Sequence, residues 1–158
     1  MGNRAAITAS TNANPDSPAL YLHWNGGVES VLAFLHAAED LGFRDPTKDP
    51  SYGLGYLQAL TAMFFGSGSS TGLGTVGSVD ADNGDNGLYI IGPKFTIADR
   101  LYAPEGDSAK TFDELSMAQR EKYHHIREQL RVMWTAAQGA GKAFNESKAL
   151  ASKITPQS

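Results

Sequence analysis

The chain has 158 residues, 41% of them hydrophobic, and a chain of this size forms one domain around one hydrophobic core. It contains no cysteine, so disulfides, thiolate nucleophiles and cysteine-ligated metal centres are excluded. Residues 1–107 carry a net charge of −7 and residues 108–158 a net charge of +3, and the acidic first part argues against a nucleic-acid groove there, because phosphate binding requires clustered lysine and arginine.

Five short strands are predicted in the first two thirds of the chain. Two of them alternate apolar and polar residues on either side of a polar turn with two prolines, which is the pattern of an N-terminal hairpin. A weak third strand lies beside the glycine-rich segment 66–78, which is expected to be a mobile loop. The last two follow the Asn-Gly pairs of residues 82–87, which favour turns with positive φ. The expected strands are residues 4–10, 20–24, 73–79, 88–91 and 95–98.

Three helices are predicted from apolar residues that recur with the helical period. The second is expected to be capped by Ser51. The third and longest begins with a capping box from Thr111 to Glu114, and Ser116 with Gln119 offers a second start a little later. Gly139 and Gly141 are expected to end or bend this helix. The expected helices are residues 28–41, 51–65 and 112–138.

These elements predict an α+β fold, in which an antiparallel sheet, made of the N-terminal hairpin and strands within 73–98, carries three helices on one face. Residues 1–107 are expected to form an α+β core domain, and residues 108–158 a long C-terminal helix and tail of the same domain. No apolar run approaches the roughly 20 residues that span a bilayer, and the N-terminus lacks the charged and apolar regions of a secretion signal. We therefore expect a cytoplasmic protein that makes no membrane contact.

The stretch from His23 to Gly27 is the most informative one for function. It joins an apolar strand to an amphipathic helix through two glycines, and such a turn leaves backbone amides at the helix start that can hold an anion or a partner's carbonyl oxygen. The alternative is a tight structural turn with Trp24 in the core, since glycine is the usual residue at such turns. The first interpretation predicts a binding site and not a catalytic one.

Two clusters of charged residues could bind a metal ion, but each has a simpler structural interpretation. The acidic residues of 80–85 are similar to those of a calcium loop, but the order of oxygen ligands that an EF-hand requires is absent, so a turn is expected. His125, Glu121 and Glu128 fall on the solvated side of the last helix. No nucleophile elbow, phosphate-binding loop or metalloprotease motif occurs in the sequence. We therefore expect no metal, no cofactor and a protein that is not an enzyme.

Three segments form a specific set: Met1–Thr8 (MGNRAAIT), Tyr21–Gly27 (YLHWNGG) with the helix that follows it, and Asp82–Gly87 (DNGDNG). Together they resemble a family of small uncharacterised proteins carried by bacteriophages, prophages and plasmids. The resemblance covers about the first 100 residues, and it implies a genetic context without transferring any catalytic residue. Small accessory proteins of phages commonly block a host defence complex or sequester its nucleotide signal, so the resemblance implies a counter-defence role.

The first functional hypothesis is a non-catalytic protein that binds and sequesters a phosphate-bearing small ligand, such as a nucleotide signal. Backbone amides of Gly26, Gly27 and Val28 would hold the phosphate. An aromatic side chain would stack on a base, and an arginine would supply charge. The residues assigned to this site are Arg4, Tyr21, His23, Trp24, Asn25, Gly26, Gly27 and Arg100.

Two alternatives stay open. In one, the protein inhibits a host defence complex, such as a CRISPR effector, by placing acidic side chains against a basic nucleic-acid groove. The residues assigned to that surface are Asp80, Asp82, Asp85 and Asp99. In the other, the protein is a small nucleotide hydrolase that uses His23 and a carboxylate of the DNGD segment. Direct contact with nucleic acid is not expected in any of these hypotheses.

The long C-terminal helix predicts a homo-oligomer. About 26 residues of helix span roughly 39 Å, which is longer than a small domain is wide. Part of its apolar stripe is therefore expected to overhang the core and to contact another copy, most simply in a two-fold dimer. Leu130, Met133 and Trp134 are the residues assigned to that contact.

Overall fold

The computed structural model describes residues 3–9, 14–66 and 70–154, with side chains up to residue 147. Its centre is a five-stranded sheet in the order β3-β2-β1-β4-β5. The strands are β1 (Ala5–Thr8), β2 (Pro18–Leu22), β3 (Thr71–Thr75), β4 (Leu88–Gly92) and β5 (Thr96–Leu101). β1 and β4 are parallel, whereas the other neighbouring strands are antiparallel.

The predicted α+β fold is confirmed, and the sheet is mostly antiparallel as expected, with one parallel pair, β1 and β4, that was not predicted. The reason is the connection after β3. The chain leaves β3 at one edge of the sheet and returns on the far side of β1, where β4 runs in the same direction as β1. The weak strand expected beside the glycine-rich segment is β3; residues 67–69 of the predicted mobile loop lie outside the described residues.

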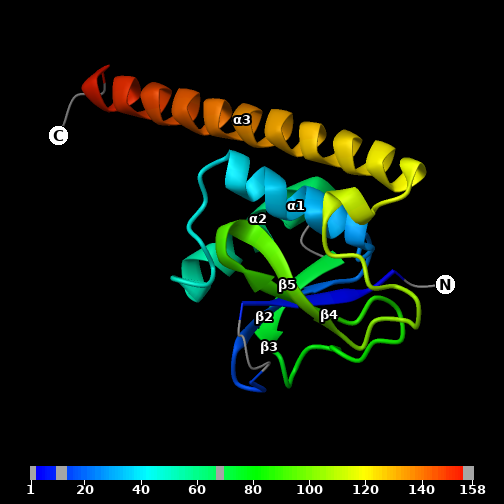
Figure 1. The fold of residues 1–158 in the computed structure, drawn as a ribbon. Coiled ribbons are helices and arrows are strands. Elements are labelled where there is room, and N and C mark those ends of the chain that lie inside the picture. Colours follow the sequence, from blue (N-terminus) through cyan, green and yellow to red (C-terminus); the bar gives the residue numbers. More distant parts are fainter. Residues whose placement is uncertain (1–2, 10–13, 67–69, 155–158) are drawn as a thin grey trace.

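Three α-helices lie on one side of the sheet (Figure 1). They are α1 (Val28–Asp40), α2 (Pro50–Phe65) and α3 (Met117–Ile154). α1 and α2 pack on the sheet, and α3 runs alongside α1 as an outer layer. The predicted helices over 28–41 and 51–65 are confirmed, although Asp49 rather than Ser51 caps α2 by accepting the Tyr52 amide. Within the described ranges, no helix is long and apolar enough to cross a membrane.

α3 begins at the second of its two predicted starts and not at the first. The capping box at Thr111 is present, but it closes a short 3-10 turn, η3 (Phe112–Glu114). α3 itself starts at Met117, after a second cap in which the Ser116 amide donates to the Gln119 side chain and the Gln119 amide donates to the Ser116 hydroxyl. Two caps in succession therefore turn the chain before the long helix starts.

α3 ends later than predicted, because it passes through Gly139 and Gly141 and reaches Ile154. An interior glycine costs only about 1 kcal/mol relative to alanine. The alanines at positions 136, 137, 140 and 143 are the strongest helix formers and offset this cost. The expected end at residue 138 is therefore wrong.

Both faces of the sheet are covered. Ile7 and Tyr89 are fully buried on the face that α1 and α2 cover, and they belong to the main core. Ala6 and Leu88 are fully buried on the opposite face. The loop that joins β3 to β4 lies against this second face, where Val79 and Leu88 line one shallow depression. A second short helix, η2 (Pro93–Phe95), forms the turn between β4 and β5.

Asn83 organises the loop that joins β3 to β4. Its side-chain amide donates to the carbonyl oxygens of Asp80 and Gly87, at 2.9 and 3.1 Å. Its side-chain oxygen accepts from the amides of Asp85 and Gly87, at 3.0 Å in both cases. Gly84 and Gly87 have φ values of 74° and 72°, so the turns predicted from the two Asn-Gly pairs are confirmed.

Candidate functional site

The turn over residues 23–27 joins β2 to α1 as predicted, with Gly27 as the N-cap of the helix. The Gly26 amide donates to the Asn3 carbonyl oxygen at 2.8 Å, and the Gly26 carbonyl oxygen accepts from the Tyr89 hydroxyl at 2.7 Å. A Cβ at Gly26 would lie 2.6 Å from the same oxygen of Asn3. Glycine is needed here for close packing, and the Gly26 amide is already used within the chain, contrary to its expected role with phosphate.

The start of α1 is occupied by a carboxylate of the chain itself. A carboxylate oxygen of Glu29 lies 2.8 Å from the position that a Cβ of Gly27 would take. Lys122 of α3 holds this carboxylate, with 3.2 Å between its Nζ and Oε1 of Glu29. The helix dipole favours a negative charge at this end, and Glu29 supplies it. A phosphate at the amides of Gly27 and Val28 would meet that charge.

Exposed His23 and Trp24 and half-buried Tyr21 form one group, the aromatic cluster. The Tyr21 hydroxyl and His23 Nδ1 are 3.1 Å apart, and the rings of His23 and Trp24 meet edge to face with centroids 4.9 Å apart. Trp24 is 47% exposed, so the alternative that places it in the core is wrong. Asn25, with a φ of 56°, turns the chain immediately after Trp24, and its side chain donates to the Ser30 hydroxyl at 3.4 Å.

Arg4 lies beside the aromatic cluster, but its charge is paired. Its Nε donates to Asp85 at 2.8 Å, its Nη1 to Asp80 at 3.2 Å, and its Nη2 to the Asn83 carbonyl oxygen. The hydrogen bond from Arg4 lowers the pKa of the Asp85 carboxyl. Burial raises the pKa of the Tyr21 phenol, which also responds to Arg4 and to both aspartates. Arg4 therefore links the aromatic cluster to the acidic loop, which is residues 80–85 between β3 and β4.

Arg100, the second arginine expected to bind phosphate, is only 4% exposed. It donates to both carboxylate oxygens of Asp107, at 2.7 and 2.9 Å, and to the Ala109 carbonyl oxygen at 3.0 Å. It also donates to the Tyr89 hydroxyl at 3.2 Å, and burial raises the pKa of that hydroxyl. Because Tyr89 in turn donates to Gly26, Arg100 supports the turn from inside the protein and does not reach its surface.

The four aspartates assigned to a partner surface do not lie together. Asp80 and Asp82 are exposed on the loop between β3 and β4, whereas Asp85 is largely covered by Arg4. Asp80 and Asp82 border a depression of about 330 Å³ whose other walls include Val79 and Tyr102. Asp99 is exposed on β5, at the edge of the sheet. Asp80 and Asp82 thus share one exposed loop, whereas Asp85 is engaged by Arg4 and Asp99 lies on β5.

The residues assigned to an oligomer contact lie mostly within the chain. Leu130 is fully buried against the core, so it cannot contact another copy. Trp134 is partly buried and packs edge to face on Phe43, with ring centroids 5.0 Å apart. Met133 is partly exposed. The first half of the apolar stripe of α3 therefore packs within the chain, because α1 and the segment after it fill the space beneath α3.

A polar network that the sequence did not predict fixes α3 to α1. Arg127 donates to both oxygens of Asp40, at 2.7 and 2.8 Å, and to the Tyr123 hydroxyl at 2.8 Å. The Tyr123 hydroxyl also hydrogen-bonds His36 Nδ1. The only sequence signal is that His36 and Asp40, like Tyr123 and Arg127, are four residues apart and so share a helix face. Nothing in either pair indicates that the two faces meet.

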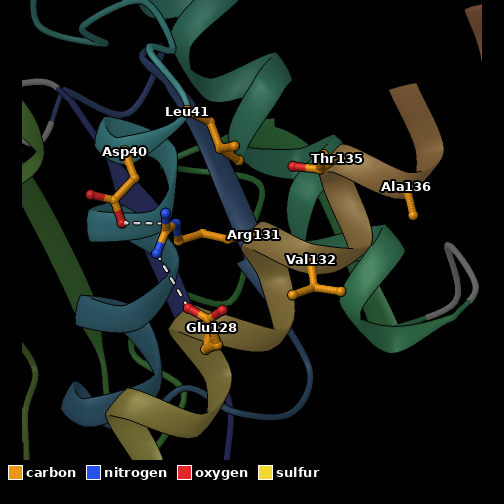
Figure 2. A pocket seen from close by; sticks show the side chains of 7 residues that line it. All are labelled: Asp40, Leu41, Glu128, Arg131, Val132, Thr135 and Ala136. Carbon is orange, nitrogen blue, oxygen red and sulfur yellow. Dashed lines mark hydrogen bonds and ion pairs between the residues drawn. The ribbon is translucent and has the colours of Figure 1, made fainter. Parts of the chain in front are cut away.

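A depression of about 480 Å³ lies next to this network, between the end of α1 and α3 (Figure 2). Arg131 crosses it, at 3.2 Å from Glu128 and 4.0 Å from Asp40. The two carboxylates that line it share Arg131, and Asp40 is also paired with Arg127 of the network. The remaining lining residues are Leu41, Val132, Thr135 and Ala136.

Comparison of the chain with protein-family models, with curated proteins and with solved structures returns no match. The resemblance to phage and plasmid proteins stays a prediction.

Proposed function

We propose that the protein acts by binding a partner protein through the aromatic cluster and the acidic loop beside it, and that it catalyses no reaction. The observation that carries this proposal is Trp24, whose ring is half exposed yet held in place by His23. Tryptophan and tyrosine are enriched among the residues that dominate binding energy at protein interfaces. A held aromatic ring also loses little conformational entropy on binding.

The charges around the cluster favour a partner with a basic surface. Arg4 and Arg100 are each paired with carboxylates of the same chain. The carboxylate of Glu29 lies close to Gly27 at the start of α1, where a phosphate was expected. Asp80, whose charge acts on Tyr21, and Asp82 remain exposed on the loop between β3 and β4. An acidic rim of this kind accelerates association with lysine-rich and arginine-rich surfaces and selects against acidic ones.

The resemblance to phage and plasmid proteins supports a partner within a bacterial defence system. In this proposal the protein covers a basic nucleic-acid groove of a host complex and keeps its nucleic acid out. A nucleotide ligand is the second candidate, because the exposed ring of Trp24 offers a face on which a base can stack.

Native mass spectrometry of the protein purified from a bacterial host with such a system tests the proposal. The variant is Trp24→Ala, and the matched control is Tyr52→Ala, which removes an exposed aromatic ring from α2. The unmodified protein and the control are expected to carry an added mass of tens of thousands of daltons. Trp24→Ala is expected to lose it, because a hot-spot residue contributes about 2 kcal/mol or more, roughly a thirtyfold change in affinity.

Two results would contradict the proposal. Retention of the partner by Trp24→Ala would show that the cluster is not the contact. An added mass of only hundreds of daltons, lost with Trp24→Ala, would favour the nucleotide ligand. Both variants should keep the melting temperature of the unmodified protein, since each removes an exposed side chain.

A further inference from the structure

A small pocket lies where the connection between α1 and α2, the helix α2 and the middle of α3 meet, and its volume is about 240 Å³. Each of the three segments contributes an aromatic ring to it: Phe43, Tyr56 and Trp134, respectively. The other described residues that line this aromatic pocket are Leu41, Gly42, Arg44 and Gln138. None of them belongs to the aromatic cluster or to the acidic loop, so the aromatic pocket is a second candidate site.

The three rings of the aromatic pocket hold one another in place. Phe43 and Tyr56 are inclined by 31° with centroids 5.1 Å apart, and Phe43 and Trp134 meet edge to face at 5.0 Å. Phe43 and Trp134 also pack against the main core, whereas Tyr56 is 41% exposed. The rings form a corner whose shape is fixed before a ligand arrives, so little conformational entropy is lost on binding.

Arg44 is held beside these rings by two contacts. Its Nη1 donates to Asp49 at 3.0 Å, and its guanidinium carbon lies 4.3 Å from the ring centroid of Tyr52. The Arg44 side chain makes no other hydrogen bond with the residues that the structure describes. Most of its N–H groups are therefore available to a ligand, while Asp49 balances its charge.

The side chains of the aromatic pocket favour a ligand that carries free hydrogen-bond acceptors. The indole of Trp134 and the guanidinium of Arg44 can only donate. Trp134 and Gln138, which are four residues apart on α3, have no side-chain hydrogen-bond partner in the described part of the chain. No carboxylate is among the described lining residues. A ligand must then supply acceptors and a flat apolar group, and it needs no charge of its own.

We propose that the aromatic pocket binds a proline-rich peptide in the polyproline II conformation. This conformation has no internal hydrogen bonds, so its carbonyl oxygens are free to accept from Trp134 and Arg44. The apolar ring of proline lies against the aromatic corner, and the preformed helix loses little entropy on binding. Grooves lined by aromatic side chains are a recurring receptor for such peptides.

A nucleotide is a poorer match for this pocket. Its base would also lie on an aromatic ring, but binding of its phosphates requires a strongly cationic surface. Arg44 is the one cation among the described lining residues, and it is shared with Asp49. The volume is also below the range of about 300 to 1,000 Å³ that encloses whole small ligands, which favours one ring of a longer chain.

The two tryptophans of the chain allow this pocket to be observed by itself. In Trp24→Phe, Trp134 is the only tryptophan, so its fluorescence reports on the aromatic pocket and not on the aromatic cluster. Titration with a capped peptide of Pro-Pro-Leu repeats is expected to change this fluorescence until it saturates. A peptide of equal length with glycine in place of every proline is the matched control and should give no saturable change.

Substitutions in the same Trp24→Phe chain test the location, with affinities measured by titration calorimetry. Tyr56→Ala removes one side of the corner and is expected to weaken peptide binding by about tenfold or more. Tyr52→Ala releases Arg44 and should weaken it by a smaller factor. Tyr102→Ala removes an exposed ring outside the pocket and should leave the affinity unchanged. Should Tyr56→Ala fail to fold, Tyr52→Ala, at a more exposed position, provides the test.

Three results would overturn the proposal. The first is a Trp134 fluorescence that does not respond to the proline-rich peptide, and the second is equal binding of the glycine peptide. The third is a saturable response to ATP but not to the peptide, which would assign the pocket to a nucleotide. Because Trp24 is replaced in all of these chains, none of the results depends on the partner bound by the aromatic cluster.

Discussion

Arg4 and Arg100 make the same kind of contact in two different settings. Arg100 is 4% exposed and is enclosed between Asp107 and the ring of Tyr89, with its guanidinium carbon 4.6 Å from the ring centroid. Arg4 is 34% exposed, and its pair with Asp85 borders solvent. Water can replace the partners of Arg4 but not those of Arg100. Burial, more than the number of hydrogen bonds, therefore sets what each arginine contributes to stability.

The two arginines also differ in role, because Arg100 supports the turn from the interior and Arg4 lies at the surface. Arg100 acts on the turn from inside, through the Tyr89 hydroxyl that holds the Gly26 carbonyl oxygen. Arg4 lies at the border of the aromatic cluster, where a partner's charges can exchange with its own. We expect substitutions at Arg100 to change stability and those at Arg4 to change binding.

Arg100→Met is expected to have the largest effect and to test the comparison directly. It removes the charge but keeps an apolar chain, and it leaves Asp107 without its cation. Breaking a buried ion pair costs about 3 to 5 kcal/mol, and the lower end applies here because Asp107 is 32% exposed and regains water. Chemical denaturation should therefore show a loss of about 3 kcal/mol in the free energy of unfolding.

The comparison fails if Arg4→Met, measured in the same way, destabilises the protein as much as Arg100→Met. A second control is Arg44→Met, which breaks an exposed pair with Asp49. That change should cost no more than about 1 kcal/mol, which is the ordinary range for surface ion pairs.

Asn83→Ala is expected to have the next largest effect. The Asn83 side chain accepts from two backbone amides and donates to backbone carbonyl oxygens while almost completely buried. Its removal leaves the amides of Asp85 and Gly87 without their partner, at a cost of about 2 kcal/mol. Asp82→Ala, at an exposed position of the same loop, is the matched control. A larger loss with Arg4→Met than with Asn83→Ala would mean that charge, and not backbone hydrogen bonding, holds the loop.

The sequence predicted elements whose signals are local. The Asn-Gly pairs, the capping residues before α3 and the helical periods of α1 and α2 each depend on neighbours a few residues apart. Contacts between distant segments carry no such signal. Arg4 and Asp85 are 81 residues apart, and His36 and Tyr123 are 87 apart. The parallel pairing of β1 with β4 was not predicted for the same reason.

Trp24 shows how a local pattern misleads when an element ends early. Alternation along the second strand places Trp24 on the same side as Leu20 and Leu22, which are buried. β2 ends at Leu22, however, and Asn25 adopts a left-handed conformation. The indole therefore leaves the core side and joins Tyr21 and His23 at the surface.

The smallest expected effect concerns His36, the titrating group in the network of Arg127. Burial, and then the charge of Arg127, lower the pKa of His36 below its ordinary value of 6.5. As the pH falls through that value, the unfolded chain binds a proton that the folded chain does not bind. The free energy of unfolding must then decrease with falling pH, whereas above pH 7 the group is neutral in both states and has no effect.

His36→Gln is expected to reduce this acid sensitivity. Glutamine keeps a polar partner for the Tyr123 hydroxyl but does not titrate, so the melting temperature of the variant should fall less between pH 7 and pH 5, a window around the ordinary histidine value of 6.5. His125→Gln is the control, because His125 is exposed on the outer side of α3. If the melting temperature falls equally with pH in the unmodified protein and in both variants, His36 takes up its proton as readily in the folded chain as in the unfolded chain. In that case the contact between α1 and α3 would be open to water, like the pair at Arg4, and not closed like the pair at Arg100.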